Sequence, residues 1–259
     1  FRLKRANVPI LRNYVLHSVQ GEKQVQQAVL CKADVQFNPI ADQKQTFEVD
    51  TVCIGYGLIP NTWLTQMFAC KHLYDPFTGG WIPYFNEQMQ TDRTGIFVAG
   101  DGAGVAGVLV ARCEGMIAGL YAAVHAGIIS KKQAEQSALI SRKKLSSLRK
   151  FRHTLDRVYP IPSSLYGNTT DDTLVCRCEG VTAGTIRQAI KDGTTDFNDI
   201  KKRTRAGMGY CQGTNCLPTV AAIIAREFGL KEKDIGLMTT RPPAKPIPLN
   251  LLMVDLAGD

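Results

Sequence analysis

The chain has 259 residues, of which 44% are hydrophobic, and it carries a formal net charge of +8 at pH 7. This length and apolar content suffice for one large domain or for two smaller domains with cores of their own. The positive charge is concentrated in residues 131–157 and 201–205, where aromatic side chains do not alternate with basic ones as they do in single-strand binders. We therefore expect no nucleic-acid partner and interpret these stretches as a solvated helix face or a partner-docking surface.

The longest apolar stretch, residues 105–129, is interrupted by Arg112, Glu114 and His125. A membrane-spanning helix needs about 20 predominantly apolar residues, so we expect no membrane span, and the opening residues do not resemble a signal peptide. The chain begins with Phe1 rather than Met, and residues 2–7 are typical of the end of a helix. We therefore expect that an N-terminal part is missing.

Eight cysteines divide into two groups of four. Four are scattered along the chain and are typical of buried thiols in a reducing compartment, which predicts a cytoplasmic protein. These are Cys31, Cys53, Cys70 and Cys113. The other four lie close together after position 175.

Three segments rich in Val, Ile, Leu and aromatic residues, 10–19, 24–33 and 46–54, predict successive strands, with Gly21 and Pro39 at the turns. Residues 56–94 contain several prolines and glycines and predict a loop-rich excursion. A short buried strand at 96–99, a glycine-rich turn at 100–107 and a helix at 108–126 follow. This order of strand, glycine turn and helix is typical of nucleotide-binding segments.

The second half of the chain begins with a basic helical connector, predicted at 130–155, and a linker at 159–173, where we place a domain boundary. Beyond it, Thr182 predicts the N-cap of a helix that ends at Gly193. Pro218 predicts the start of another helix that ends at Gly229. The tail from residue 241 contains four prolines and predicts extended, polyproline-like backbone that wraps a neighbouring surface or hangs loose.

The grouped cysteines form a CxC pair, Cys176 and Cys178, and a CxxxxC pair, Cys211 and Cys216. A [2Fe-2S] cluster needs four thiolates, two on each iron, and two loops that each present a cysteine pair supply this set. Three glycines near the second pair, Gly207, Gly209 and Gly213, favour a close approach of the loops. The pattern therefore favours an iron–sulfur cluster.

Two other interpretations of the four cysteines stay open. Zinc also binds four thiolates, although structural zinc sites usually use two CxxC-like knuckles with short ligand loops. Two disulfides rank lowest, because a CxC disulfide closes a strained ring and nothing marks the chain as secreted.

The segments VCRCEGVT and RAGMGYCQGTNC resemble the bacterioferritin-associated ferredoxin type of [2Fe-2S] domain over residues 173–230. The simplest members of that family carry CxxC as the second pair, whereas CQGTNC is similar to the longer form in flavin-linked amino-acid dehydrogenase subunits. The resemblance implies that Cys176, Cys178, Cys211 and Cys216 are the cluster ligands.

Residues 102–107 read GAGVAG and literally match the GxGxxG fingerprint of a dinucleotide-binding turn. The acidic residue expected about 20 positions later is absent, because neither Asp nor Glu occurs between Glu114 and Glu135. We therefore reject the simple Rossmann interpretation. An ordinary tight turn between a strand and a helix remains the structural alternative.

The wider string TGIFVAGD, residues 94–101, is similar to the second flavin-contacting motif of flavoproteins with two dinucleotide-binding domains. By this resemblance Asp101 binds a hydroxyl of the FAD ribityl chain, and Gly100 and Gly104 let the backbone approach the cofactor. Residues 49–64 resemble the segment where the chain returns to the FAD domain, with Gly55, Gly57 and Pro60 carrying the match. The resemblance implies that the first FAD fingerprint lies in the missing part.

Nearly the whole chain resembles the large subunit of flavin-dependent amino-acid or amine dehydrogenases, the group that includes opine oxidase, dye-linked proline or hydroxyproline dehydrogenase, and hydrogen cyanide synthase. The resemblance implies an electron-transferring subunit that passes electrons from a carbon–nitrogen oxidation through FAD and a [2Fe-2S] cluster. A non-catalytic iron–sulfur carrier and an NAD(P)H-dependent flavoprotein reductase are the alternatives. The sequence leaves open whether NAD(P) binds and identifies no catalytic residue.

The resemblance also predicts an organisation and partners. The expected fold class is α/β, the C-terminal part of a two-dinucleotide-domain flavoprotein, followed by a small, mainly α-helical [2Fe-2S] domain. The predicted parts are the end of an NAD(P)-like domain at 1–50, part of the FAD domain at 51–130, the basic connector and linker at 131–172, the [2Fe-2S] domain at 173–235 and a proline-rich tail at 236–259. The expected partners are a small ferredoxin-like protein and a second flavoprotein dehydrogenase subunit.

Overall fold

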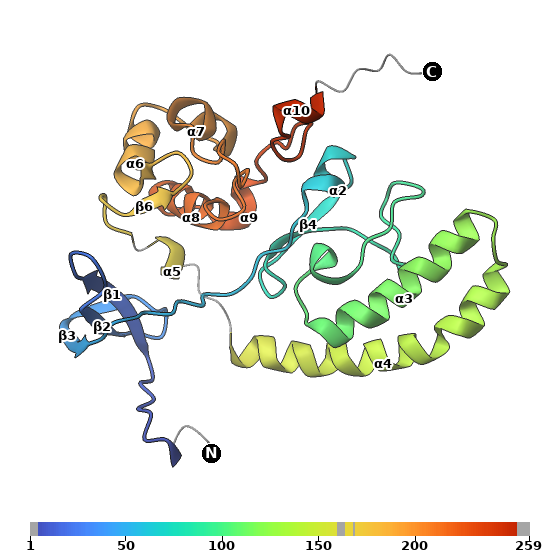
Figure 1. The fold of residues 1–259 in the computed structure, drawn as a ribbon, viewed down its shortest axis with the longest axis horizontal. Coiled ribbons are helices and arrows are strands. Elements are labelled where there is room, and N and C mark those ends of the chain that lie inside the picture. The colour runs from blue at the N-terminus through green and yellow to red at the C-terminus, as the bar shows by residue number, and fades with distance from the viewer. Residues whose placement is uncertain (1–4, 160–163, 168, 253–259) are drawn as a thin grey trace. The chain divides into compact units, whose positions relative to one another are not determined.

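The computed structural model describes residues 5–159, 164–167 and 169–252. The chain divides into two compact units, one made of residues 1–56 with 162–168 and the other of residues 57–161 with 169–259. Helices and strands both occur, as expected for the α/β class, and every pair of strands in the described residues is antiparallel. Figure 1 shows the elements in chain order, from blue to red.

The first unit is a three-stranded antiparallel meander of β1 (Tyr14–Gln20), β2 (Gln27–Ala33) and β3 (Pro39–Glu48). The central strand β2 supplies most of the buried positions, whereas β3 is exposed along almost its whole length. The helical turn α5 (Ser164–Gly167) belongs to the same unit, where the Tyr166 hydroxyl donates a 2.8 Å hydrogen bond to the carbonyl oxygen of Tyr56.

The first two predicted strands are confirmed with shortened ends, but the third was placed too late in the sequence. We expected it at 46–54, and β3 occupies Pro39–Glu48 instead. An edge strand with both faces exposed needs no apolar alternation, so its polar sequence gave no strand signal. Pro39 is the first residue of the strand, a position where the missing N–H is tolerated.

The second unit begins with three short elements in the segment predicted to be irregular. These are the helix α2 (Trp63–Met67) and the hairpin of β4 (His72–Asp75) and β5 (Gly80–Pro83). The strand expected at 96–99 does not form as a regular strand, because in the described residues only Phe97 forms a bridge, to Gln90. The glycine turn contains the short 3-10 helix η1 (Gly100–Ala103).

Two long helices follow the glycine turn, and both were predicted. Helix α3 (Val108–His125) and helix α4 (Lys131–Val158) lie side by side as a helical hairpin (Figure 1). Ser130 starts α4 with a capping box, in which its hydroxyl accepts from the Gln133 N–H and the Gln133 side chain accepts from the Ser130 N–H. Ala134, Ala138 and Leu145 of α4 are buried in one core with α3, so α4 packs as a structural layer.

The cysteine-rich part of the second unit is a small helical assembly on a two-stranded hairpin, β6 (Leu174–Cys176) and β7 (Val181–Thr182). Helices α6 (Ala183–Lys191), α7 (Phe197–Thr204), α8 (Leu217–Phe228) and α9 (Glu232–Ile235) follow. Thr182 caps α6 as predicted, and Gly229 ends α8 in the left-handed conformation. The buried side chains Ile186, Ile200, Val220, Ile223 and Ile224 form the core.

The tail after this assembly contacts α2. The Thr240 hydroxyl donates a 2.9 Å hydrogen bond to the Gln66 side chain, and the Lys245 ammonium lies 4.8 Å from the centre of the Trp63 ring. Residues 241–248 contain no helix or strand, as predicted, and the helical turn α10 (Leu249–Leu252) ends the described part.

Candidate cofactor sites

The four grouped cysteines come from two loops of the helical assembly. Cys176 ends β6 and Cys178 lies in the turn that follows, whereas Cys211 and Cys216 lie between α7 and α8. Cys216 is the N-cap residue of α8, so its thiol lies at the positive end of that helix. All eight cysteines of the chain are free thiols.

The four thiols associate as two pairs, each joining one loop to the other. Cys216 is hydrogen-bonded to Cys176, and Cys211 to Cys178. The first pair is buried, whereas Cys178 is exposed and Cys211 half-buried. In the described part of the chain no three His, Cys, Asp or Glu side chains lie together as ligands of one metal ion. Two pairs fit a two-iron cluster, in which each iron takes two thiolates.

Gly209 makes the close approach of the two loops possible. A Cβ atom at this position would lie 2.2 Å from the Cβ of Cys178, a distance that no side chain can tolerate. On the other side of the site, the Gly207 N–H donates to the Cys176 sulfur at 3.5 Å. The loops therefore leave room for thiolates and a cluster but not for any additional side chain.

The surroundings of the two loop-end cysteines act in opposite directions. Burial raises the pKa of Cys216 far above its ordinary value, and the neighbouring Cys176 and Cys211 raise it further. Burial also raises the pKa of Cys211, but hydrogen bonds from backbone N–H groups, led by Asn215, and from Cys178 outweigh it and lower the pKa overall. The outer loop therefore stabilises a thiolate already in the protein without metal.

The cations near this site are partly neutralised. Arg205, which ends α7 in the left-handed conformation, donates a 2.8 Å hydrogen bond to the carboxylate of Glu179. Its guanidinium remains largely exposed, so this ion pair lies at the rim of the site rather than in its centre. The N-terminus of α8 is the more direct source of positive potential.

The predicted flavin contacts Gly100, Asp101 and Gly104 lie on the turn η1, which leads into the N-terminus of α3. Gly100 and Gly104 have positive φ angles of 65° and 132°, conformations that favour glycine. The Asp101 carboxylate is exposed, and in the described part of the chain it forms no ion pair, so its oxygens can accept hydrogen bonds from ligand hydroxyls. The turn therefore fits a polyhydroxylated cofactor near a helix N-terminus.

A buried carboxylate that the sequence analysis did not identify holds this turn. Glu114 of α3 is only 4% exposed, and its Oε2 accepts a 2.9 Å hydrogen bond from the Gly100 N–H. Its Oε1 accepts from Arg149 of α4 at 3.0 Å. The only signal in the sequence was an acidic residue at a core-facing position of an apolar helix, which requires a partner.

The two segments with flavoprotein resemblance meet around the β4–β5 hairpin. The Val105 N–H donates to the Thr78 carbonyl oxygen at 3.0 Å, and a Cβ on Gly79 would lie 2.6 Å from the Leu58 carbonyl oxygen. Gly57 has a φ angle of 108° and belongs to the same unit as Asp101. Gly55 belongs to the other unit, so its predicted flavin contact stays a prediction.

The residues outside these two sites are structural where the structure describes their contacts. Cys113 is buried in the core of α3 and α4, as expected. Cys53 is exposed, so our expectation that all four scattered thiols are buried is wrong at this position, because it lies in an irregular segment. His72 is half-buried between the Thr65 hydroxyl and the Cys70 carbonyl, and burial lowers its pKa.

Helix α3 is long and apolar enough to cross a membrane by length and composition alone. Core helices pass the same test, and α3 buries six of its residues, including the ion-paired Glu114, with one third of the helix buried overall. Its packing against α4 and η1 is that of a core helix.

We predict that Gly209→Ala prevents cluster incorporation, because the added methyl group would overlap Cys178. Iron and sulfide analysis and visible absorption of the purified chain measure this effect. The matched control is Gly119→Ala in α3, where no atom lies within 4 Å of the added carbon. Equal iron content in Gly209→Ala and the parent chain would contradict the close approach.

We predict that Glu114→Ala lowers the free energy of unfolding by about 2 kcal/mol, because the buried Gly100 N–H and Arg149 lose their acceptor. Glu114→Gln retains an oxygen acceptor without the charge and should lower it by less. Urea denaturation measures both variants. Glu135→Ala, which removes an exposed ion pair with Lys131, is the control and should change stability by less than about 0.5 kcal/mol. Equal effects at Glu114 and Glu135 would refute the proposed role.

Two protein families match separate segments of the chain. Residues 2–127 match the family described as pyridine nucleotide-disulphide oxidoreductase, and residues 174–226 match the BFD-like [2Fe-2S] binding domain. The order of the two segments agrees with the resemblance predicted from the motifs. These matches support FAD and a [2Fe-2S] cluster as the cofactors.

Several curated proteins are similar over most of the chain. A subunit of opine oxidase from Rhizobium meliloti is 34% identical over 81% of this chain and 40% of its own length. Hydrogen cyanide synthase subunit HcnB from Pseudomonas aeruginosa is 29% identical over 96% of this chain and 53% of its own length. The chain therefore spans about half the length of these relatives.

A solved structure supports the fold. The crystal structure of L-proline dehydrogenase from P. horikoshii superposes with a TM-score of 0.67 at 22% identity, covering 96% of this chain and 46% of the other. At this identity the match shows a flavoprotein-type dinucleotide-binding fold. Together with the two segment matches and the similarity to the opine oxidase subunit, it shows that the chain belongs to the flavoprotein oxidoreductases that carry a BFD-like [2Fe-2S] domain after a pyridine nucleotide-disulphide oxidoreductase segment.

Proposed function

We propose that this chain is the electron-transferring subunit of a flavin-dependent amino-acid or amine dehydrogenase. The observation that carries the proposal is the presence, in one chain, of a flavin-type turn held by Glu114 and two facing cysteine pairs behind it in the sequence. Similarity to subunits of opine oxidase and hydrogen cyanide synthase supports the oxidation of a carbon–nitrogen bond as the reaction.

On the flavin side, Asp101 would accept hydrogen bonds from the hydroxyls of the FAD ribityl chain, and Gly100 and Gly104 would let the backbone approach. Bound FAD supplies two-electron oxidation and can release the electrons one at a time. Gly55 and Gly57 are the further contacts that we propose. The carboxylate of Glu114 holds the turn in place, which keeps Asp101 oriented before the cofactor arrives.

On the cluster side, Cys176, Cys178, Cys211 and Cys216 would be the iron ligands. A bound [2Fe-2S] cluster supplies one-electron transfer. Burial of Cys176 and Cys216 keeps water away from one end of the site, whereas Cys178 and Cys211 reach the surface. Met208 and Tyr210 beside Cys211 are exposed, 40% and 73% respectively, and form an apolar edge that a redox partner can contact.

We infer that the partner is a second flavoprotein dehydrogenase subunit in which the substrate is oxidised, and that a small ferredoxin-like protein is a further component. The relatives support assembly from several polypeptides, because their names describe subunits. The free thiols at Cys31, Cys70 and Cys113 are buried and support a reducing compartment, which we propose is the cytoplasm.

An NAD(P)H-dependent flavoprotein reductase is the second candidate, favoured by the pyridine nucleotide-disulphide oxidoreductase match. In that function NADH would reduce the flavin directly, and the amino acid would not. Anaerobic mixing of the holoprotein with NADH, followed by the loss of flavin absorbance, distinguishes the two candidates. A chain with iron but no flavin at all would favour the third function, a non-catalytic iron–sulfur carrier.

We predict about two irons and two sulfides per chain after anaerobic purification, with a visible spectrum that disappears in Cys176→Ser and Cys211→Ser. Each substitution removes one of four ligands. Cys53→Ser is the matched control, because Cys53 is an exposed cysteine outside the site and its loss should leave the spectrum unchanged. A colourless chain that holds one zinc ion would refute the redox function.

We predict that Asp101→Ala lowers the flavin content of the holoprotein about tenfold, because charge-assisted hydrogen bonds to cofactor hydroxyls are lost. The ratio of flavin to protein absorbance measures this effect. Asp42→Ala, an exposed carboxylate on β3, is the control and should leave the ratio unchanged. Full flavin occupancy in Asp101→Ala would remove Asp101 from the proposed site.

A further inference from the structure

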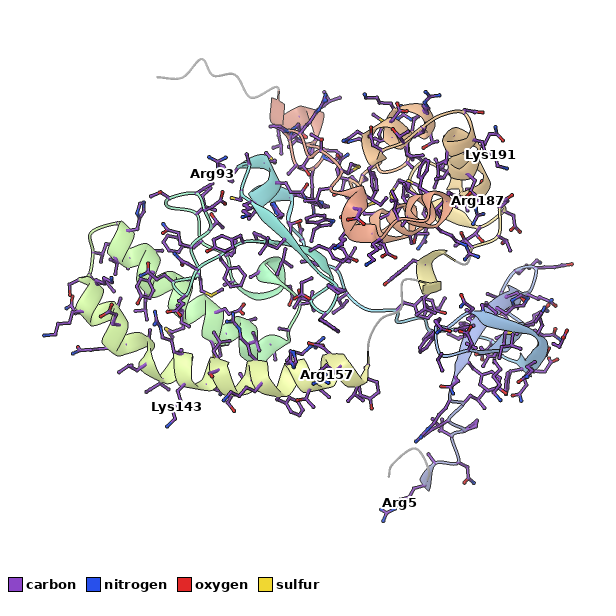
Figure 2. All side chains as sticks on the ribbon, turned by 180° about the vertical axis from the view of Figure 1, so that it is seen from behind. Arg5, Arg93, Lys143, Arg157, Arg187 and Lys191 are labelled. Carbon is purple, nitrogen blue, oxygen red and sulfur yellow. The ribbon has the colours of Figure 1, made fainter. Side chains whose placement is uncertain are left out.

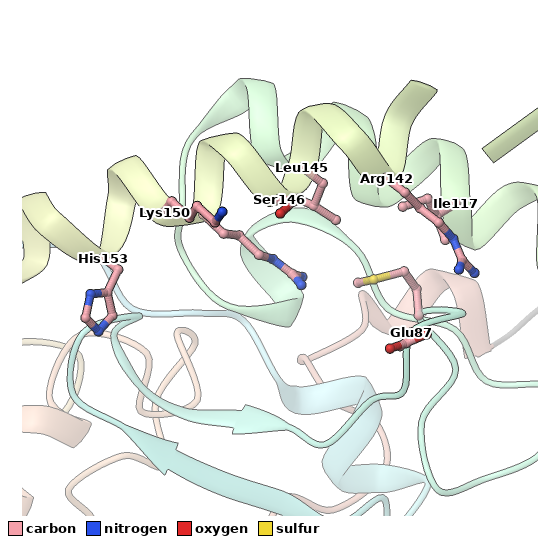
Figure 3. A pocket seen from close by; sticks show the side chains of 9 residues that line it. Glu87, Ile117, Arg142, Leu145, Ser146, Lys150 and His153 are labelled. Atoms are coloured by element: carbon pink, nitrogen blue, oxygen red, sulfur yellow. The ribbon is translucent and has the colours of Figure 1, made fainter. Parts of the chain in front are cut away.

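A cavity of about 630 Å³ lies between α4, α3 and the segment that contains Glu87 and Met89. Its walls come from residues of one compact unit. The lining residues from α4 recur on one face of that helix, at spacings of three, four or seven positions. They are Arg142, Leu145, Ser146, Arg149, Lys150 and His153. Figure 3 shows Arg142 and His153 extending from α4 toward the side where Glu87 lies.

Arg142 brings an uncompensated positive charge to the cavity. Its Nη2 donates a 2.9 Å hydrogen bond to the Tyr121 hydroxyl, and its guanidinium lies 5.6 Å from the centre of the Tyr121 ring. Both contacts are with a neutral side chain. Its Nε is buried and has no hydrogen-bond partner among the residues that the structure describes. A buried donor without an acceptor is unfavourable, and a ligand oxygen would satisfy it.

The other cations of the cavity differ in their availability. Arg149 is already paired with Glu114, whereas Lys150 forms no ion pair in the described part of the chain. Glu87 supplies one negative charge to the lining. Arg142, Arg149 and Lys150 outnumber Glu87 and the paired Glu114, so the wall as a whole is positive.

The remaining lining is apolar. Met89, Ile117 and Leu145 are 2%, 1% and 6% exposed and belong to the core that joins α3 to α4. A ligand in the cavity would therefore contact cationic groups and an apolar floor at the same time. A simple ion would use only the first of these features.

We propose that this cavity binds an organic phosphate monoester, with its phosphate group on Arg142 and Lys150 and an apolar body on Met89 and Ile117. A phosphate carries enough negative charge to compensate both cations, and guanidinium groups bind phosphate oxygens with directional hydrogen bonds. The lining includes none of the predicted FAD or cluster contacts, so the proposal stands apart from the electron-transfer function.

The test is titration calorimetry of the full-length holoprotein with phenyl phosphate, for which we expect a Kd below about 1 mM that weakens at high salt. Arg142→Gln and Lys150→Ala should each weaken binding about tenfold. The matched control is Lys143→Ala, because Lys143 is exposed on the same helix, outside the cavity lining, and projects outward (Figure 2). Lys150→Ala keeps the test valid if Arg142→Gln fails to fold, since Lys150 is exposed.

Two further probes separate the contributions. Benzoate has the apolar ring with a single charge and should bind at least about tenfold more weakly than phenyl phosphate. Inorganic phosphate lacks the ring and should also bind more weakly. No heat of binding with phenyl phosphate, an equal loss in Lys143→Ala, or equal affinity for inorganic phosphate would each overturn the proposal.

Discussion

The buried carboxylate of Glu114 connects three parts of the second unit that are distant in sequence. It lies on α3, accepts the backbone N–H of Gly100 and pairs with Arg149 on α4. A carboxylate that is only 4% exposed is stable only when such partners compensate for the water it has lost. The same side chain therefore determines the conformation of the turn that presents Asp101 and the position of α4 against α3.

This arrangement gives α4 a structural role that its composition conceals. The helix is strongly basic, and most of its cations point into solvent, as a solvated face or docking surface would require. Its small residues Ala134 and Ala138 are fully buried and allow close packing with α3. Arg142 and Arg149 turn inward instead and bind Tyr121 and Glu114. One helix thus combines a surface, a packing interface and one wall of a cavity.

The cysteine site is formed by a different constraint, the absence of a side chain at Gly209. The hydrophobic core of α6, α7 and α8 places the two loops near each other, and the missing Cβ lets them meet. Because this core consists of aliphatic side chains, it can hold the loops in position independently of a cluster. Burial of Cys176 and Cys216 with exposure of Cys178 gives the site an inner and an outer end, as an electron carrier with a surface partner requires.

The sequence alone determined the features that depend on local chemistry. Helix caps at Ser130 and Thr182, the glycine stop at Gly229 and the spacing of the four cysteines follow from preferences of a few neighbouring residues, and motif resemblance identified both cofactor segments. Tertiary structure decided the rest. The edge strand β3 has no apolar alternation to reveal it, and the pairing of Glu114 with Gly100 and Arg149 joins residues 14 and 35 positions apart. The pairing of Cys176 with Cys216 and of Cys178 with Cys211 also depended on packing, because spacing along a chain does not specify which side chains meet across two loops.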